Sequence, residues 1–159
     1  MNPISDIENV VRVIFPSTMM NNGELLPAAF NLRELKDGAE KCISVFRQFY
    51  ETFDDDIKKF DRKRNLPCCV LNVGDINTIN LKIKDITVKY KVDEAKSEIF
   101  PSHCGIFIKL NDIPLEGSGK KIFEILKVGE AASFISMSIR RRLVDLAKHK
   151  MTGVQYLVK

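Results

Sequence analysis

The sequence predicts an α+β fold: a single domain with a mixed or antiparallel sheet of about five strands and C-terminal helices packed on it. Residues 86–92 alternate between apolar and polar side chains, which is typical of a strand with one buried face. Several β-branched runs bounded by Pro, Gly or Asn indicate further strands. After residue 118 the apolar residues recur at helical spacing. We therefore divide the domain, residues 1–159, into a mainly β part with one helix (1–117) and a basic helical part (118–151).

The composition is that of one folded domain. The chain has 159 residues, of which 45% are hydrophobic and 29% charged. No apolar run reaches the roughly 18 residues that a membrane span needs, and the first residues lack the basic and apolar segments of a secretory signal. We therefore expect a cytoplasmic protein that does not engage a membrane.

The four cysteines form no C-x-x-C pair. Two of them, Cys68 and Cys69, are adjacent in a predicted strand, so their side chains point to opposite faces and suit no common metal ion. Without a secretory signal we expect reduced thiols packed as small hydrophobic side chains. The sequence thus predicts neither a metal site nor a cofactor.

The first strand is predicted over residues 7–15, a β-branched run that ends at Pro16. Arg12 lies inside this run and faces away from Val11 and Val13, since successive side chains of a strand alternate. A buried arginine is costly unless it is paired. Arg12 is therefore either an edge or solvent-face residue or a cation positioned for an anionic ligand.

The next part of the chain is less regular. Residues 21–23, Asn-Asn-Gly, are a turn signal. Residues 24–32 are apolar but contain Pro27, which predicts a short edge element or an irregular packed segment. Residues 33–41 predict a loop or a brief helical turn, and residues 42–50 have the composition of a strand.

One helix is predicted from Thr52, which can cap its first turn. Three aspartates, 54–56, lie near its start, and Lys63 and Arg64 lie near its end, as the helix dipole favours. A short strand of buried type follows over residues 67–73 and precedes the alternating strand.

A Pro-Ser-His turn, residues 101–103, precedes an apolar strand that begins near Ile106. His103 would lie at the mouth of this strand, where a side chain that titrates near neutral pH can be reached by a ligand. The alternative is a histidine that only hydrogen-bonds a backbone carbonyl group. Cys104 next to it suggests a Cys-His pair, but neighbouring side chains of an extended segment diverge.

Four side chains are the candidate catalytic residues: Arg12, Ser44, Arg47 and His103. Together with Ser17 and Ser102 they could converge into an anion site with a general base. On a strand, however, Ser44 and Arg47 face opposite ways, because they are three positions apart.

The last third of the chain carries the excess positive charge. Residues 118–151 contain eight Lys or Arg and three Asp or Glu, which leaves 17 basic and 18 acidic residues for the remainder. One helix is predicted around residues 122–126 and a second over about 130–149, with Gly129 between them. A terminal strand could follow over 154–158.

Two basic features of this third are candidate binding sites. Gly119, Lys120 and Lys121 resemble part of a phosphate loop, although Pro114 replaces the first glycine and Lys121 the hydroxyl residue of the Walker pattern. A glycine-rich turn that opens a basic helix can still bind an anion. Arg140, Arg141 and Arg142 form a basic patch for an acidic partner protein or for nucleic acid.

Short motifs resemble a family of small, uncharacterised prokaryotic proteins found in variable, defence-like gene neighbourhoods. The similar pieces are residues 11–16 (V-R-V-I-F-P), Gly23 with Ala29-Phe30, residues 43–47 (I-S-V-F-R) and residues 101–103 (P-S-H). They extend over about two thirds of the chain. In similar sequences the residue after Ser-Val is often acidic, whereas here it is Phe46, and the basic C-terminal helices resemble an addition. The resemblance implies a class of protein and no particular reaction.

Three functions follow as hypotheses. The first is a non-enzymatic accessory protein of a prokaryotic defence or conflict system, which binds a partner protein through its basic C-terminal helices. The second is a small hydrolase or transferase that acts on a nucleotide or nucleic acid, with His103 as general base and Arg12 and Arg47 on phosphate. The third is a salt-sensitive nucleic-acid binder that uses the C-terminal lysines and arginines.

Overall fold

The structure, a computed structural model, describes residues 3–150 and 155–156. Its centre is an eight-stranded sheet in the order β12-β7-β1-β6-β10-β9-β8, with β11 added beside β10, and all its pairings are antiparallel. The expected α+β fold is confirmed. The expected number of about five strands is too low, because three short strands join the sheet at its edges. The strands are β1 (Asn9–Val13), β6 (Ile43–Arg47), β7 (Pro67–Asn72), β8 (Leu81–Ile83), β9 (Ile86–Glu94), β10 (His103–Leu110), β11 (Ile113–Pro114) and β12 (Gln155–Tyr156).

Two small hairpins lie outside this sheet. Strands β2 (Met20–Asn21) and β3 (Glu24–Leu25) are joined by the expected Asn-Gly turn, in which Gly23 has a φ of 78°. Strands β4 (Glu34–Leu35) and β5 (Gly38–Ala39) form the second hairpin, so the expectation of a loop or helical turn there was wrong. Side chains at its two ends, Arg33 and Glu40, pair at 3.0 Å and hold the hairpin closed.

Short helices connect the strands, and one long helix ends the chain. As expected, a break at Gly129 separates two C-terminal helices. Of the expected strand 154–158, the structure describes Gln155 and Tyr156, which form β12; the other positions lie outside the described residues. The helices are α1 (Pro16–Met19), α2 (Phe53–Asp61), α3 (Val73–Asn77), α4 (Lys120–Ile125) and α5 (Ala132–Lys150), with the 3₁₀ turns η1 (Pro27–Phe30) and η2 (Gly129–Ala131).

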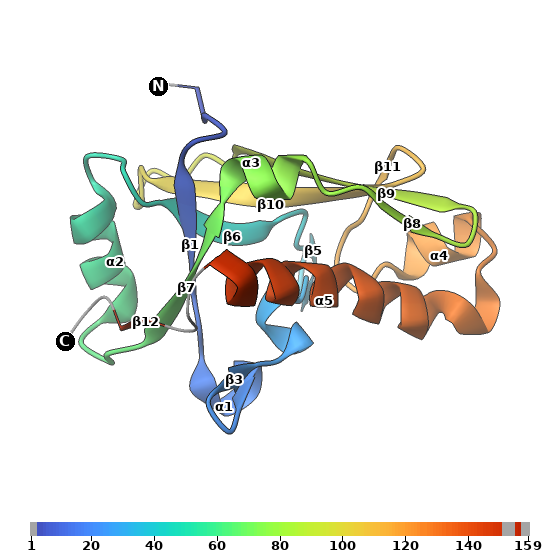
Figure 1. Ribbon diagram of the computed structural model, residues 1–159, viewed down its shortest axis with the longest axis horizontal. Helices are drawn as coiled ribbons and strands as arrows, with labels where there is room; N and C mark the ends of the chain where they lie inside the picture. Colours follow the sequence, from blue (N-terminus) through green and yellow to red (C-terminus); the bar gives the residue numbers. More distant parts are fainter. Residues whose placement is uncertain (1–2, 151–154, 157–159) are drawn as a thin grey trace.

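Helix α5 covers one face of the sheet (Figure 1). Its buried side chains, including Ile135, Ile139 and Leu143, belong to the same core as Val10 of β1 and Val45 of β6. The Tyr90 hydroxyl of β9 donates a hydrogen bond of 2.7 Å to the Ile139 carbonyl oxygen. The helical part of the chain therefore completes the core of the β part.

Helix α2 packs on the opposite face and covers only the β7-β1-β6 end of the sheet. Phe53 and Ile57 of α2 contact a smaller core that contains Val11 and Phe46. The outer side of β9 remains uncovered, and its residues alternate between buried and exposed as the sequence predicted. This uncovered face begins where α2 ends.

The sheet curls at β6, which pairs with β1 and with β10 over different parts of its length. It pairs with β1 only at Val10↔Arg47 and Val11↔Phe46, and with β10 from His103↔Phe46 to Ile106↔Ile43. Beyond Val11, strands β1 and β6 therefore diverge, and Figure 1 shows β1 and β7 running steeply across the nearly horizontal β10 and β9. The next residue of β1 after this divergence is Arg12.

Candidate functional site: an aromatic pocket with a half-buried arginine

The Arg12 side chain bridges the place where β1 and β6 diverge. Its Nε donates to the Ala29 carbonyl oxygen at 3.0 Å, and its Nη1 donates to the Ser44 carbonyl oxygen at 2.8 Å. Ser44 pairs with Gly105 of β10 but has no partner on β1, and Ala29 lies in the 3₁₀ turn η1. The guanidinium therefore donates to a carbonyl group that the β1-β6 pairing leaves unused and to one outside the sheet. Arg12 faces away from Val11 and Val13, as expected, because those two belong to the α2-side core.

The charge of Arg12 has no direct counter-ion among the described residues. Among these residues, no carboxylate lies within ion-pair distance of the guanidinium, and Nη2 has no hydrogen-bond partner. Burial lowers the pKa of Arg12, because the lost hydration favours the neutral form. Buried cations are ordinarily paired. An arginine held by two neutral carbonyl groups thus has electrostatic capacity left for an anionic or carbonyl-bearing ligand.

Arg12, Ser44 and His103 line one cavity of about 180 Å³, which we call the aromatic pocket. Four phenylalanines form most of its wall. Their rings meet edge to face or tilted, with centroid distances of 5.5–6.3 Å, and His103 joins the group at 5.8 Å from Phe46. The lining residues are Arg12, Val13, Phe15, Ser44, Phe46, Phe60, Ser97, Phe100 and His103.

His103 is the first residue of β10 and half-buried, so the expected position at a strand mouth is confirmed. Its Nδ1 lies 2.8 Å from the Ala95 carbonyl oxygen. A carbonyl oxygen only accepts, so Nδ1 carries the proton and Nε2 of the neutral ring has a free lone pair. Nε2 has no hydrogen-bond partner among the described residues. The ring is thus both anchored to the backbone and available as an acceptor or base.

Asp56 of α2 holds the turn that carries Phe100 and His103. Its Oδ2 accepts from the Ser102 N–H at 2.8 Å, from the Ser102 hydroxyl at 2.5 Å and from the Thr52 hydroxyl at 2.8 Å. Asp56 and Ser102 are both fully buried. Thr52 does not cap the helix N–H groups as expected, because its hydroxyl is used by Asp56. Asp56 is therefore a positioning residue for one wall of the pocket.

Arg47 does not join the pocket. It lies on the opposite face from Ser44, as the strand spacing predicted, and is 4% exposed. Its Nε and Nη2 donate to the two carboxylate oxygens of Glu8 at 2.9 and 2.8 Å, and its guanidinium lies 5.1 Å from the centre of the Tyr50 ring. Arg47 thus fixes the start of β1 to β6.

The two further serines proposed for the site also lie elsewhere. Ser17 is exposed in α1, and Ser102 is bound by Asp56; neither lines the aromatic pocket. The cysteines offer no nucleophile in this region. Burial raises the pKa of Cys69 and of Cys104 to about 12 in each case, so both thiols stay protonated at neutral pH.

The glycine-rich loop already contacts an anion, and that anion belongs to the protein. The Glu34 carboxylate accepts from the Ser118 N–H at 2.9 Å and from the Ser118 hydroxyl at 2.7 Å. These hydrogen bonds lower the pKa of Glu34. Gly119 has a φ of 80° and precedes α4, while Lys120 and Lys121 are exposed. An external anion would meet only these two lysines, so the expected anion site stays a prediction.

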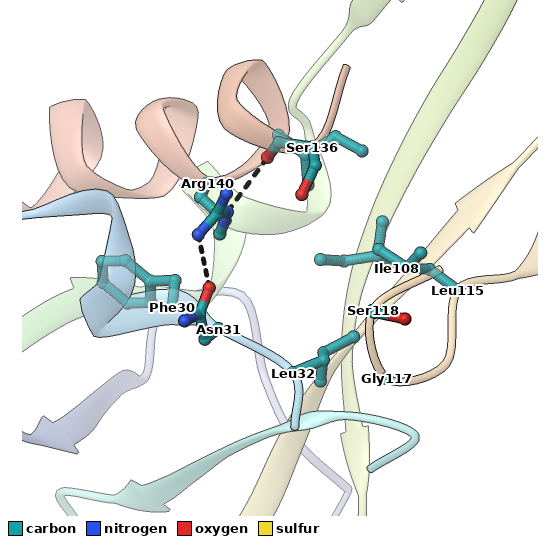
Figure 2. A pocket seen from close by; sticks show the side chains of 10 residues that line it. Phe30, Asn31, Leu32, Ile108, Leu115, Gly117, Ser118, Ser136 and Arg140 are labelled. Atoms are coloured by element: carbon teal, nitrogen blue, oxygen red, sulfur yellow. Dashed lines mark hydrogen bonds between the residues drawn. The ribbon is translucent and has the colours of Figure 1, made fainter. Parts of the chain in front are cut away.

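Arg140 lines a second cavity, of about 250 Å³, between α5, η1 and the glycine-rich loop (Figure 2). Its Nη1 donates to the Asn31 side-chain oxygen and its Nε donates to the Ser136 carbonyl oxygen at 3.2 Å. Burial lowers the pKa of Arg140. Arg140 therefore ties α5 to the segment after η1, and only Arg141 and Arg142 of the basic patch are exposed.

Sequence reasoning missed most of the aromatic pocket. Phe15, Phe60 and Phe100 come from three distant segments, and no local pattern joins them. The role of Asp56 was also missed, since three successive aspartates suggested only solvated charge. One available signal was its position: Asp56 falls beside Ile57 on the apolar side of the helix, where an aspartate must find a partner.

Comparisons with known proteins add no relative from which the role of the aromatic pocket could be inferred. No protein-family model, curated protein or solved structure matches the chain. The resemblance to small proteins of defence-like neighbourhoods therefore stays a prediction. Within residues 3–150 and 155–156, no three His, Cys, Asp or Glu side chains gather as metal ligands would. No helix in the same residues has both the length and the apolar composition needed to cross a bilayer.

Proposed function

We propose that the protein binds a nucleotide, free or as a unit of a nucleic acid, with its base in the aromatic pocket. The observation that carries the proposal is Arg12, a half-buried arginine without a direct counter-ion among the described residues, at a cavity lined by four phenylalanines. Aromatic rings stack on any nucleobase. Arginine can donate to base carbonyl oxygens, and the free Nε2 of His103 can accept from a ring or amino N–H.

The size of the pocket limits what enters it. A cavity of about 150 Å³ can hold a benzene molecule, so about 180 Å³ suits one planar ring system better than a whole nucleotide. The sugar and phosphate would then remain at the mouth. The Arg64 guanidinium lies 5.5 Å from the centre of the ring of Phe15, which lines the pocket.

A second candidate function is catalysis on the bound nucleotide, which the tautomer of His103 favours. Ser44 and His103 are diagonal neighbours across β6 and β10, a relation that places their Cβ atoms roughly 7 Å apart. That separation admits a water molecule or a ligand group between them. If His103 acts as the general base, wild-type protein should release phosphate or base from a nucleotide, and His103→Ala should abolish release while binding persists.

Calorimetric titration with the four common ribonucleoside monophosphates tests the proposal. We expect binding that Phe100→Ala weakens by about fivefold or more, since stacking contributes about 1–3 kcal/mol per base. Phe49→Ala is the matched control, because Phe49 is 67% exposed and lies outside the pocket. Thermal unfolding of both variants checks that the fold persists. Absence of binding by every nucleotide, or equal loss in both variants, would contradict the proposal.

A further inference from the structure

Five cations surround the end of helix α2, in a segment that we call the basic turn. They are Lys58, Lys59, Arg62, Lys63 and Arg64, and all five are exposed. The acid among them, Asp61, is 2% exposed and faces inward, where its carboxylate accepts from the backbone N–H groups of Asn65 and Leu66 at 3.0 and 2.7 Å. None of the five cations forms an ion pair in the described part of the chain. Within residues 58–64, the exposed charged side chains are therefore all basic.

The helix dipole alone does not account for so many cations. It places about half a negative charge at the end of a helix, which one or two basic side chains already offset. Arg64 serves this purpose, since it donates to the carbonyl oxygens of Asp61 and Phe60 at 2.8 Å each. Arg62 and Lys63 have left-handed backbone conformations, with φ of 51° and 62°, and no hydrogen bond to the described residues engages their side chains.

The basic turn borders the aromatic pocket on two sides. Arg64 lies over Phe15, and the Lys59 ammonium group donates to the Ile99 carbonyl oxygen at 3.3 Å, one residue before Phe100. Phe60, between them in sequence, lines the pocket itself. A base inserted among the phenylalanines would thus leave its phosphate next to a positive surface.

We infer that the ligand of the aromatic pocket is a single-stranded polynucleotide whose backbone phosphates lie along the basic turn. This inference rests on the proposed function and specifies its ligand. Bases of an intact duplex are stacked and paired, so only an unpaired base can enter the pocket without a large cost. Phosphates that follow along the strand then replace counter-ions at the lysines and arginines, which adds salt-dependent affinity.

A second basic surface, a broad groove, matches a polyanion less well than the basic turn does. It has a volume of about 780 Å³ on the outer side of β9 and β10 and contains Lys89, Lys91 and Lys109. Two of these lysines face aspartates, Lys89 with Asp112 at 3.6 Å and Lys91 with Asp93 at 3.7 Å. The groove therefore serves as a comparison in the experiment.

The test compares affinities for four kinds of ligand. Fluorescence anisotropy measures the binding of labelled oligothymidine, oligouridine and a matched duplex, and calorimetry measures the binding of the mononucleotide. Three double charge reversals change the net charge equally: Arg62→Glu with Lys63→Glu, Lys89→Glu with Lys109→Glu, and Arg141→Glu with Arg142→Glu. We expect both single strands to bind at least tenfold more tightly than the mononucleotide and the duplex. Only the first variant should lose this advantage, and its salt slope should fall by about 1.4, or about 0.7 per lost phosphate contact. Its affinity for the mononucleotide, whose single phosphate meets fewer of these cations, should fall less than its affinity for the single strands.

Each other outcome overturns a specific step. Equal affinity for oligonucleotide and mononucleotide would refute the polynucleotide inference and leave the proposed function intact. Equal affinity for the duplex would refute the requirement for an unpaired base. A loss in either of the other two double variants, with the first unaffected, would exclude the basic turn. Absence of binding by the mononucleotide and by every oligonucleotide would refute the proposed function itself.

Discussion

Arg12 Nη1 lies 2.8 Å from the Ser44 carbonyl oxygen, at the point where strands β1 and β6 stop pairing. One side chain thereby closes a gap in the backbone ladder and forms part of the aromatic pocket. The divergence of the two strands leaves the Ser44 carbonyl group free to accept from Arg12, which lines the pocket. Fold and candidate site thus depend on one residue.

Replacing this cation tests its two roles separately. Arg12→Met keeps the apolar stem but leaves the Ala29 and Ser44 carbonyl groups without donors, so unfolding free energy should fall by about 1–3 kcal/mol. Nucleotide affinity should fall at least tenfold, and Arg12→Lys should restore only part of it, since an ammonium group lacks the planar fork. Urea unfolding and calorimetry measure the two effects. Arg141→Met, which replaces an exposed arginine outside the described ion pairs, is the control.

Asp56 should matter for stability and for binding. Asp56→Ala leaves the buried N–H and hydroxyl of Ser102 without an acceptor, which should cost about 2–4 kcal/mol of unfolding free energy. Because the turn with Phe100 and His103 loses its anchor, nucleotide affinity should also fall. Asp55→Ala, one residue earlier and exposed, should change either quantity little. Equal behaviour of the two variants would exclude the positioning role.

The Glu8–Arg47 pair should make stability depend on acid pH. Burial alone would raise the pKa of Glu8, but hydrogen bonds from Arg47 and from the Ser5 N–H lower it, and the net shift is downward from 4.5. A lowered pKa in the folded state means that the pair stabilises fully above the ordinary value and loses its effect as pH falls through the folded value.

In Glu8→Gln, unfolding free energy at neutral pH should therefore fall by about 1–3 kcal/mol, and its decline below about pH 4.5 should be shallower than in wild type. Urea unfolding from neutral to acid pH measures both. Glu51→Gln, an exposed control outside any described ion pair, should leave the profile unchanged. If unfolding free energy falls as steeply below pH 4.5 in Glu8→Gln as in wild type, other carboxylates cause the acid sensitivity.

Regular patterns made much of the fold predictable. The alternation from Ile86 to Val92 fixed which side of β9 is buried, and Gly129 marked the break between the C-terminal helices. The hairpin at residues 34–39 was missed, because its two strands have only two residues each and the Arg33–Glu40 pair that flanks them is not visible in strand composition. The short strands β8 and β11 were missed as well, since two or three residues carry no periodic signal.

The site was predictable only where single residues were unusual. A lone arginine in a β-branched run and a histidine at a turn drew attention to Arg12 and His103, and the structure brings both to one pocket with Ser44. Arg47 seemed as good a candidate as Arg12. However, Arg47 lies three positions after Ser44 on β6 and therefore on the opposite face of the strand. The phenylalanine wall depends on contacts between α2, the turn before β10 and the end of β1, which no local pattern contains.

The nitrogen NMR spectrum of the imidazole rings reports both the tautomer of His103 and the entry of a nucleotide into the aromatic pocket. The chain has only two histidines, so His103 can be assigned with His149 as internal reference. In its neutral form, His103 should show a protonated Nδ1 and an unprotonated Nε2. Addition of a nucleoside monophosphate should move the His103 Nε2 resonance in wild type and much less in Phe100→Ala, with His149 unchanged. The reverse tautomer, or an Nε2 resonance that stays constant while calorimetry reports binding, would contradict the account.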